Sequence, residues 1–105
     1  MKKVFVSIPM RDKERSEILS GQKKALSSLT EYLNEHLSLI ESFLDVDATP
    51  LECLGESIKR MSFADYVLFA EGWENARGCR IEHECANEYG KKIFCENEGR
   101  ITEKY

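Results

Sequence analysis

Long apolar stretches are missing from this 105-residue chain, which also has only two prolines and a single tryptophan. Its longest hydrophobic stretch near the start, MKKVFVSIPM, is a few residues long and is interrupted by Ser7 and Pro9. A secretory signal needs an apolar segment of about 7–15 residues, and a membrane helix needs about 20. The sequence therefore predicts no membrane span and a cytoplasmic location.

Basic charge is also scarce. Lys and Arg number 15 against 19 Asp and Glu, which gives a net charge of −4 and an isoelectric point near 5.2. Broad nucleic-acid binding requires a net basic face that displaces counterions from phosphates. We therefore expect no nucleic-acid partner, although a local basic pocket for one small phosphate is compatible with this composition.

Several familiar site motifs are absent. The four cysteines include no C-x-x-C pair, and the two histidines do not stand at metal-ligand spacing, so we expect reduced thiols and no metal site. The chain has no G-x-G-x-x-G or Walker sequence, and no serine or cysteine has a recognisable base partner. These absences exclude the usual dinucleotide, NTPase and triad-hydrolase patterns.

What the sequence does contain is an alternation of strand and helix signals over one expected domain, residues 1–105. Helical spacing predicts a helix over 14–36, with Ser16 as a plausible N-cap, and a second helix over 78–89 that ends at Gly90. A capping box formed by Thr49, Pro50 and Glu52 predicts the start of another helix. Apolar, β-branched runs predict strands at 3–8, 39–44, 66–70 and 92–95. The run 39–44 also suits a continued helix, and 101–105 either adds a short fifth strand or trails away.

This alternation predicts an α/β fold, a doubly wound parallel sheet of four to five strands with helices on both faces. Ligands of such sheets bind beyond the carboxyl ends of the strands, where the strand order reverses. Two loops fit that position. The first supplies Ser7, Ile8, Pro9, Met10 and Arg11, and the second supplies Gly72, Trp73, Arg77 and Gly78.

Each loop has a functional and a purely structural interpretation. Arg11 can bind a phosphate or carboxylate through two hydrogen bonds, but a loop arginine is more often simply solvated. Arg77 and Gly78 lie at a helix N-terminus, which favours an anion. Trp73 offers a flat surface for stacking on a base, and packing at the rim of the core or at a subunit interface is equally compatible.

Glu82 is the most informative residue. At about 100° per residue, Ile81, Cys85, Ala86 and Tyr89 form an apolar arc that includes Glu82, while His83 falls on the polar side. A carboxylate on a buried face costs free energy unless it has a partner. It is either a half-exposed residue paired with Arg77 or Lys91, or a functional acid able to attack an anomeric carbon as retaining glycosidases do.

Three segments carry a resemblance: KVFVSIPMR, the run Ala64–Leu68, and above all GWENARGCRIEHECANEYGKKI. Over most of its length the chain resembles the nucleoside 2-deoxyribosyltransferase-like superfamily, and especially its small phage and bacterial members of unknown function. The superfamily pattern E-x-x-x-A-x-x-x-G-K is met by Glu82, Ala86, Gly90 and Lys91. The resemblance implies a flavodoxin-like or Rossmann-like fold with Glu82 as the catalytic nucleophile.

The resemblance also implies that the first loop, Ser7 to Arg11, binds the sugar or its phosphate. The chain departs from the superfamily at two places. It lacks the usual glycine before the proline or arginine of this loop, and Ser57, flanked by Glu56, stands where active members often carry an aspartate. The helical phase places Ser57 beside Leu54 and Met61, so it is not an obvious substitute for that aspartate.

The activity implied is that of a nucleoside or nucleotide N-glycosyl transferase or hydrolase without a cofactor. Glu82 would attack C1′ of a (deoxy)ribosyl group, expel the base, and pass the sugar to another base or to water. The resemblance further implies a homodimer or higher homo-oligomer. Two alternatives remain open: a non-catalytic module that binds a nucleotide or related metabolite, and a structural protein in which Glu82 pairs across a subunit interface.

Overall fold

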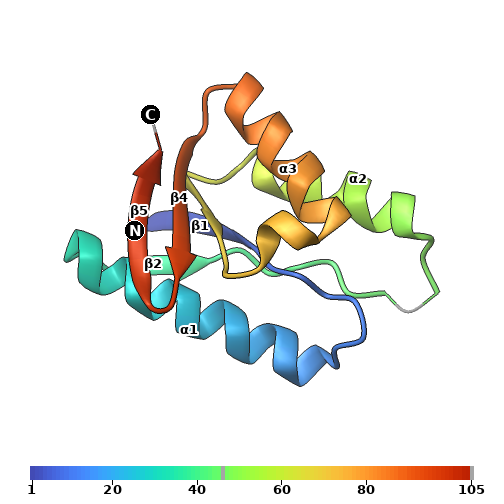
Figure 1. Ribbon diagram of the computed structural model, residues 1–105. Coiled ribbons are helices and arrows are strands. Elements are labelled where there is room, and N and C mark those ends of the chain that lie inside the picture. Colours follow the sequence, from blue (N-terminus) through green and yellow to red (C-terminus); the bar gives the residue numbers. More distant parts are fainter. Residues whose placement is uncertain (46, 105) are drawn as a thin grey trace.

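Strands and helices alternate along the chain in the computed structural model, which describes residues 1–45 and 47–104. The elements in chain order are β1 (Lys2–Ser7), α1 (Arg15–Leu33), β2 (Leu37–Leu39), α2 (Pro50–Met61), β3 (Tyr66–Phe69), the short 3-10 turn η1 (Trp73–Asn75), α3 (Arg77–Glu88), β4 (Lys92–Asn97) and β5 (Arg100–Lys104). Tyr105, the last residue of the expected fifth strand, lies outside the described residues. Figure 1 shows this arrangement.

The strands form one sheet in the order β2-β1-β3-β4-β5. The first four are parallel, with Val4 opposite both Leu39 and Tyr66. The prediction of an all-parallel sheet is wrong for β5, which pairs antiparallel with β4. A parallel connection needs a crossover of a dozen or more residues, whereas only Glu98 and Gly99, at φ 53° and 77°, separate these two strands.

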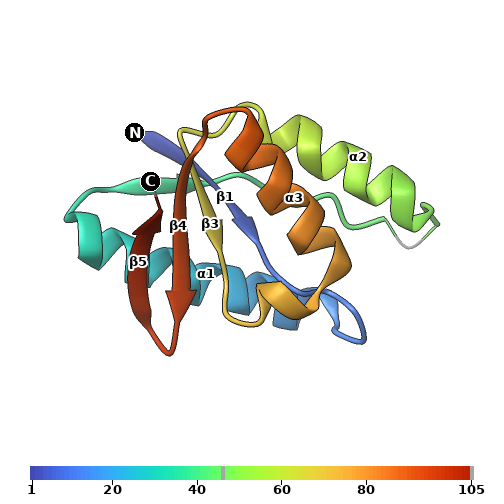
Figure 2. The same cartoon turned by 45° about the horizontal axis from the view of Figure 1, so that its top comes forward.

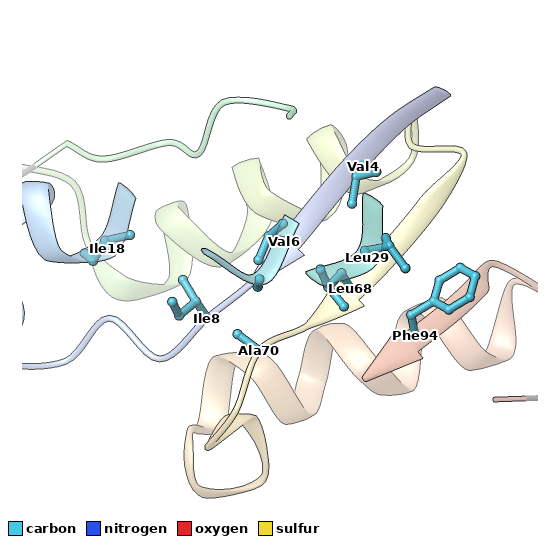
Figure 3. Close-up of a cluster of buried hydrophobic side chains, with 9 residues drawn as sticks. Val4, Val6, Ile8, Ile18, Leu29, Leu68, Ala70 and Phe94 are labelled. Carbon is cyan, nitrogen blue, oxygen red and sulfur yellow. The ribbon is translucent and has the colours of Figure 1, made fainter. Parts of the chain in front are cut away.

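Helices cover both faces of the sheet, and each face has its own core (Figures 1 and 2). Helix α1 packs on one face, where Figure 3 shows the apolar side chains that fill the space, among them Val4, Val6, Ile18, Leu29 and Phe94. On the other face the core is built from Phe5, Met61, Ala64, Val67, Phe69, Ala86 and Ile93, which come from the strands, from α2 and the turn after it, and from α3. The central strands β1 and β3 are largely buried, and their apolar runs are continuous, as expected for strands that are covered on both faces.

The start of α1 and the extent of β2 differ from prediction. Helix α1 is capped by Glu14, whose capping box with Glu17 replaces the expected N-cap Ser16. Strand β2 covers only 37–39, and most of the expected strand 39–44 is irregular.

Ile40 N at the start of that segment still donates to Val4 O of β1 (2.9 Å), and the residues after it are held by hydrogen bonds from three helical side chains. Arg15 Nη2 donates to Leu44 O (2.7 Å), Arg60 Nη1 to Glu41 O (2.6 Å), and Gln22 Nε2 to Ser42 Oγ (2.5 Å). Because these donors satisfy the backbone and side-chain oxygens, the segment does not need to continue the ladder.

Gly21 lets α1 approach the first loop closely. A Cβ at this position would lie 2.6 Å from Cδ1 of Ile8, well inside contact distance. Glycine has a low helix propensity, but at position 21 it allows α1 to pack against the residue that follows β1.

None of the helices in the described part of the chain combines the length and apolar character that crossing a bilayer requires.

The cap of α2 gives a direct test of the fold. Thr49 Oγ1 accepts from Glu52 N, and Glu52 Oε1 accepts from Thr49 N. We expect Thr49→Ala to lower the free energy of unfolding by about 0.5–2 kcal/mol, measured by urea denaturation, because it leaves an N-terminal N–H group without its acceptor. The control is Ser28→Ala on α1, which removes only a bond to the carbonyl of Lys24 one turn earlier. An equal loss in both variants would contradict this account of the cap.

Candidate functional site

Glu82 lies on the buried face of α3, as the sequence predicts, and is 7% exposed. Its buried companions on this helix are Cys79 and Ala86. The prediction that Ile81 and Tyr89 share this face is wrong, since their side chains are 39% and 85% exposed. The helix is rotated so that Glu82, rather than the apolar arc beside it, faces the sheet.

The rotation of α3 has a visible cause in its packing. His83, which the sequence places on the polar side, is half-buried because its ring packs against Phe69 and Trp73. On the opposite flank, α3 packs against α2. Hydrophobic periodicity alone does not predict this rotation of α3, because a histidine ring takes the place of an aliphatic side chain at the contact.

A hydroxyl from the sheet holds the Glu82 carboxylate. Ser7 Oγ donates to Glu82 Oε1 at 2.5 Å, and both residues are buried. Ser7 is the last residue of β1, and its carbonyl accepts from Ala70 N (2.9 Å), which follows β3. The acid therefore stands at the carboxyl ends of two adjacent parallel strands.

A second hydroxyl reaches the same carboxylate from α2. Ser57 is 7% exposed, and its side chain acts on Glu82 by lowering the pKa of that acid. The prediction that Ser57 lies on the same face of α2 as Met61 is confirmed, because both residues are buried. Its spacing of four residues from the buried Met61 is the sequence signal for this orientation.

Burial raises the pKa of Glu82, and the hydroxyls of Ser7 and Ser57 act in the opposite direction by stabilising the carboxylate. Within the described part of the chain, neither Arg77 nor Lys91 forms an ion pair with this acid. Lys91 Nζ instead donates to the carbonyls of Ser62 (2.9 Å) and Ala64 (3.0 Å). The interpretation of Glu82 as a half-exposed member of a salt bridge is therefore wrong.

Cys79 completes this polar cluster. Burial, with a smaller contribution from the Glu82 carboxylate, raises the pKa of its thiol to about 11, although Ser7, Lys13 and Arg80 act to lower it. At neutral pH the side chain is a protonated thiol and a poor nucleophile. Its contribution is a buried, uncharged wall beside the acid.

The two loops that the sequence singles out meet at this site. A Cβ at Gly72, where φ is +88°, would lie 3.7 Å from Cγ of Pro9. Within the first loop Ile8 is buried, Pro9 and Met10 are half-buried, and Arg11 is exposed. The loops thus form one rim at the carboxyl edge of the sheet.

Trp73 packs at the rim of the core, which is one of the two roles expected for it. Its ring stacks on His83 with centroids 4.3 Å apart and an interplanar angle of 12°, and it lies 5.2 Å from Phe69. Because His83 occupies one ring face, a base could stack only on the other. Arg77 and Gly78 are exposed at the start of α3.

A surface depression lies at the opposite edge of the sheet from Glu82. It is lined by Met1, Lys2, Glu35, His36 and Asp65, at the amino ends of the strands and the end of α1.

In the described residues, no group of three or more His, Cys, Asp or Glu side chains could hold a metal ion. Around Glu82 the structure brings together one acid, the hydroxyls of Ser7 and Ser57, and the thiol of Cys79.

Comparison with known proteins found no match to this chain among family models, curated proteins or solved structures.

The raised pKa of Glu82 predicts a pH-dependent effect on stability. The folded protein holds a proton that the unfolded chain releases near pH 4.5, so the contribution of Glu82 to stability falls as pH rises from about that value to its raised pKa. We expect Glu82→Gln to raise the free energy of unfolding by about 0.5–2 kcal/mol near pH 8, because it removes the buried charge and keeps the hydrogen bonds.

The measurement is urea denaturation between pH 4 and 8.5, with the difference between variant and wild type plotted against pH. That difference should grow above pH 4.5 and then level off. Glu88→Gln, an exposed change on the same helix, is the control. A difference that is flat with pH for Glu82→Gln would show that the acid is not perturbed by burial.

Proposed function

We propose that this chain is a nucleoside or nucleotide N-glycosyl transferase or hydrolase that acts at C1′ of a (deoxy)ribosyl group. The observation that supports this best is the Glu82 carboxylate: it is buried, has hydroxyl partners and no ion pair in the described residues, and stands at the ends of β1 and β3. The resemblance of GWENARGCRIEHECANEYGKKI to the nucleoside 2-deoxyribosyltransferase-like superfamily assigns the nucleophile to the same residue.

The fold we propose for this function is the doubly wound, flavodoxin-like arrangement. The strand order β2-β1-β3-β4 with helices on both faces supports it, and the order reverses between β1 and β3. In folds of this type the ligand binds at that reversal. Ser7 at the end of β1 and Gly72 after β3 stand on the two sides of this position.

In the proposed reaction an oxygen of Glu82 attacks C1′, and the bond from C1′ to the base nitrogen breaks. The base leaves with the bonding electron pair and takes up a proton. Water or a second base then attacks C1′ and releases the carboxylate. The hydroxyls of Ser7 and Ser57 would stabilise the carboxylate as it leaves in this second step, since charge-assisted hydrogen bonds are the stronger ones.

The rim of the site supplies the proposed substrate contacts. Residues Ser7 to Arg11 would contact the sugar or its phosphate, and Gly72, Trp73, Arg77 and Gly78 the base or an anionic group. The exposed guanidinium groups of Arg11 and Arg77 support an anionic substrate. We further propose that the protein works without a cofactor, in the cytoplasm, and as a homo-oligomer.

Glu82→Ala tests the assignment of the nucleophile. We expect it to reduce base release by at least about 10³-fold, measured by chromatography across a panel of nucleosides and deoxynucleoside monophosphates. The control is Glu88→Ala, which changes an exposed carboxylate on the same helix. Circular dichroism should show that both variants are folded. If wild type releases no base from any member of the panel, the proposed activity is wrong.

Ser57→Ala tests how the acid is tuned. The Ser57 hydroxyl lowers the pKa of Glu82, so its removal should raise that pKa further. We expect the acid limb of the pH profile of kcat/KM to move to higher pH, with activity retained well above that of Glu82→Ala. An unchanged acid limb would exclude this role for Ser57.

A non-catalytic binding module is the second candidate. It is favoured by the 7% exposure of Glu82, by the Ser7 hydroxyl bound to its Oε1, and by serine at the position of the superfamily aspartate. Calorimetry with a deoxynucleoside monophosphate, followed by product analysis of the same sample, separates the two candidates. Binding with the ligand intact favours the module, and free base rejects it.

A further inference from the structure

The base that leaves in the proposed reaction must gain a proton unless it already carries a positive charge. When the bond from C1′ to the base nitrogen breaks, the electron pair goes to the base, and a neutral base leaves as an anion unless an acid protonates it. A general acid works best when its pKa lies near the working pH. The groups that the described structure places around Glu82 do not meet this requirement.

The nearest groups to the Glu82 carboxylate are hydroxyls and a thiol. Ser7 Oγ donates to Glu82 Oε1 (2.5 Å), and Ser57 acts on the same acid. A serine hydroxyl keeps its proton near neutral pH. Cys79, one helical turn before Glu82, has a thiol pKa of about 11 because it is buried. None of these three groups is suited to protonate a departing base.

His83 is the residue beside Glu82 whose side-chain type titrates near neutral pH. It follows Glu82 in the chain, but consecutive side chains on a helix point about 100° apart. Its ring lies against Phe69 and Trp73, with centroids 4.8 Å and 4.3 Å away. The imidazole therefore belongs to the aromatic contact at the rim and not to the surroundings of the Glu82 carboxylate.

The second loop favours a positively charged base. A cation over the face of an indole ring is attracted by that ring, and Trp73 has one ring face beyond its stacked neighbour. Exposed Glu71 and Glu74 lie on either side of Trp73 in the chain. Glu98 N donates to Glu71 Oε1 (2.7 Å), and Glu71 N donates to Glu96 Oε1 (3.2 Å). Acidic residues therefore gather on the side of the site where we place the base.

The basic side chains at the site suit a different part of the substrate. Arg11 is exposed in the first loop, which we assign to the sugar or its phosphate, and Arg77 is exposed at the start of α3. Arg80 Nη1 donates to Glu74 O (2.9 Å). These positions are compatible with a phosphate on the sugar and a cationic base in the same substrate.

We propose that the substrates of this site are N-glycosides whose base is already cationic, such as a ribosyl pyridinium or an N7-alkylated purine nucleotide. This inference rests on the proposed function. An oxygen of Glu82 attacks C1′, the bond from C1′ to nitrogen breaks, and the electron pair neutralises the positive charge of the base. The base leaves without taking up a proton. Water then attacks C1′, loses one proton, and releases the carboxylate.

Matched nucleotides test this inference on the wild-type protein. Guanosine monophosphate and 7-methylguanosine monophosphate share sugar and phosphate and differ in the charge of the base; nicotinamide mononucleotide is a second cationic substrate. Base release is measured by chromatography at pH 6.5, and Glu82→Ala supplies the background of non-enzymatic cleavage. We expect kcat/KM to be at least about 10²-fold higher for 7-methylguanosine monophosphate, since a positioned acid contributes about 10²–10⁴-fold. A smaller preference overturns the inference.

The pH profile with nicotinamide mononucleotide tests the absence of a leaving-group acid directly. We expect kcat/KM to stay level between pH 7 and 8.5, because no group has to keep a proton for the departing base. A fall over this range would reveal such an acid and overturn the inference.

Trp73→Leu tests the placement of the cationic base. It should raise KM for nicotinamide mononucleotide at least about threefold, because it removes the attraction between the cation and the indole ring. Trp73→Phe is the matched variant and should keep most of the binding, since it retains an aromatic face. An unchanged KM in Trp73→Leu also overturns the inference.

The same substrates separate this inference from the proposed function. Cleavage of the cationic nucleotides with the stated preference supports both. Similar rates on guanosine monophosphate and 7-methylguanosine monophosphate overturn the inference and leave the proposed function standing. Failure to release base from any of the three nucleotides or from the wider panel overturns both.

Discussion

The hydrogen bond from Ser7 Oγ to Glu82 Oε1 joins the end of the central strand to the middle of α3. A carboxylate in this position loses most of its hydration, so the surrounding structure must provide polar partners of its own. It does so with two hydroxyls from different elements, Ser7 of β1 and Ser57 of α2, and the acid thereby fixes how α3 lies on α2 and on the sheet. The same bonds that make the buried acid tolerable also set its proton affinity.

The features that the sequence predicts well are those set by local patterns. The capping box at Thr49 depends on three neighbouring residues, and the structure confirms it. The burial of Glu82 follows from its spacing to Ala86 on the same helix. The strands predicted at 3–8, 66–70 and 92–95 are confirmed as β1, β3 and β4, since each is a continuous apolar run.

The features that the sequence does not predict are set by contacts between distant residues. Strand β2 ends early because Arg15 and Arg60, 29 and 19 residues from their acceptors, supply the hydrogen bonds. The spacing from Met61 places Ser57 on the buried face of α2. That this face meets Glu82 depends on how the two helices pack, which no spacing within one helix reveals. The antiparallel direction of β5 is different, because it was not predicted although the turn at Gly99 is a local signal for an antiparallel hairpin.

The stack of Trp73 on His83 gives the candidate site an intrinsic fluorescence signal. Trp73 is the only tryptophan of the chain, and it lies in η1, between Gly72 and the start of α3. Indole emission responds to the ring beside it and to contact with water. An unlabelled sample therefore carries its own fluorophore at the rim of the site, with no second indole elsewhere to obscure its signal.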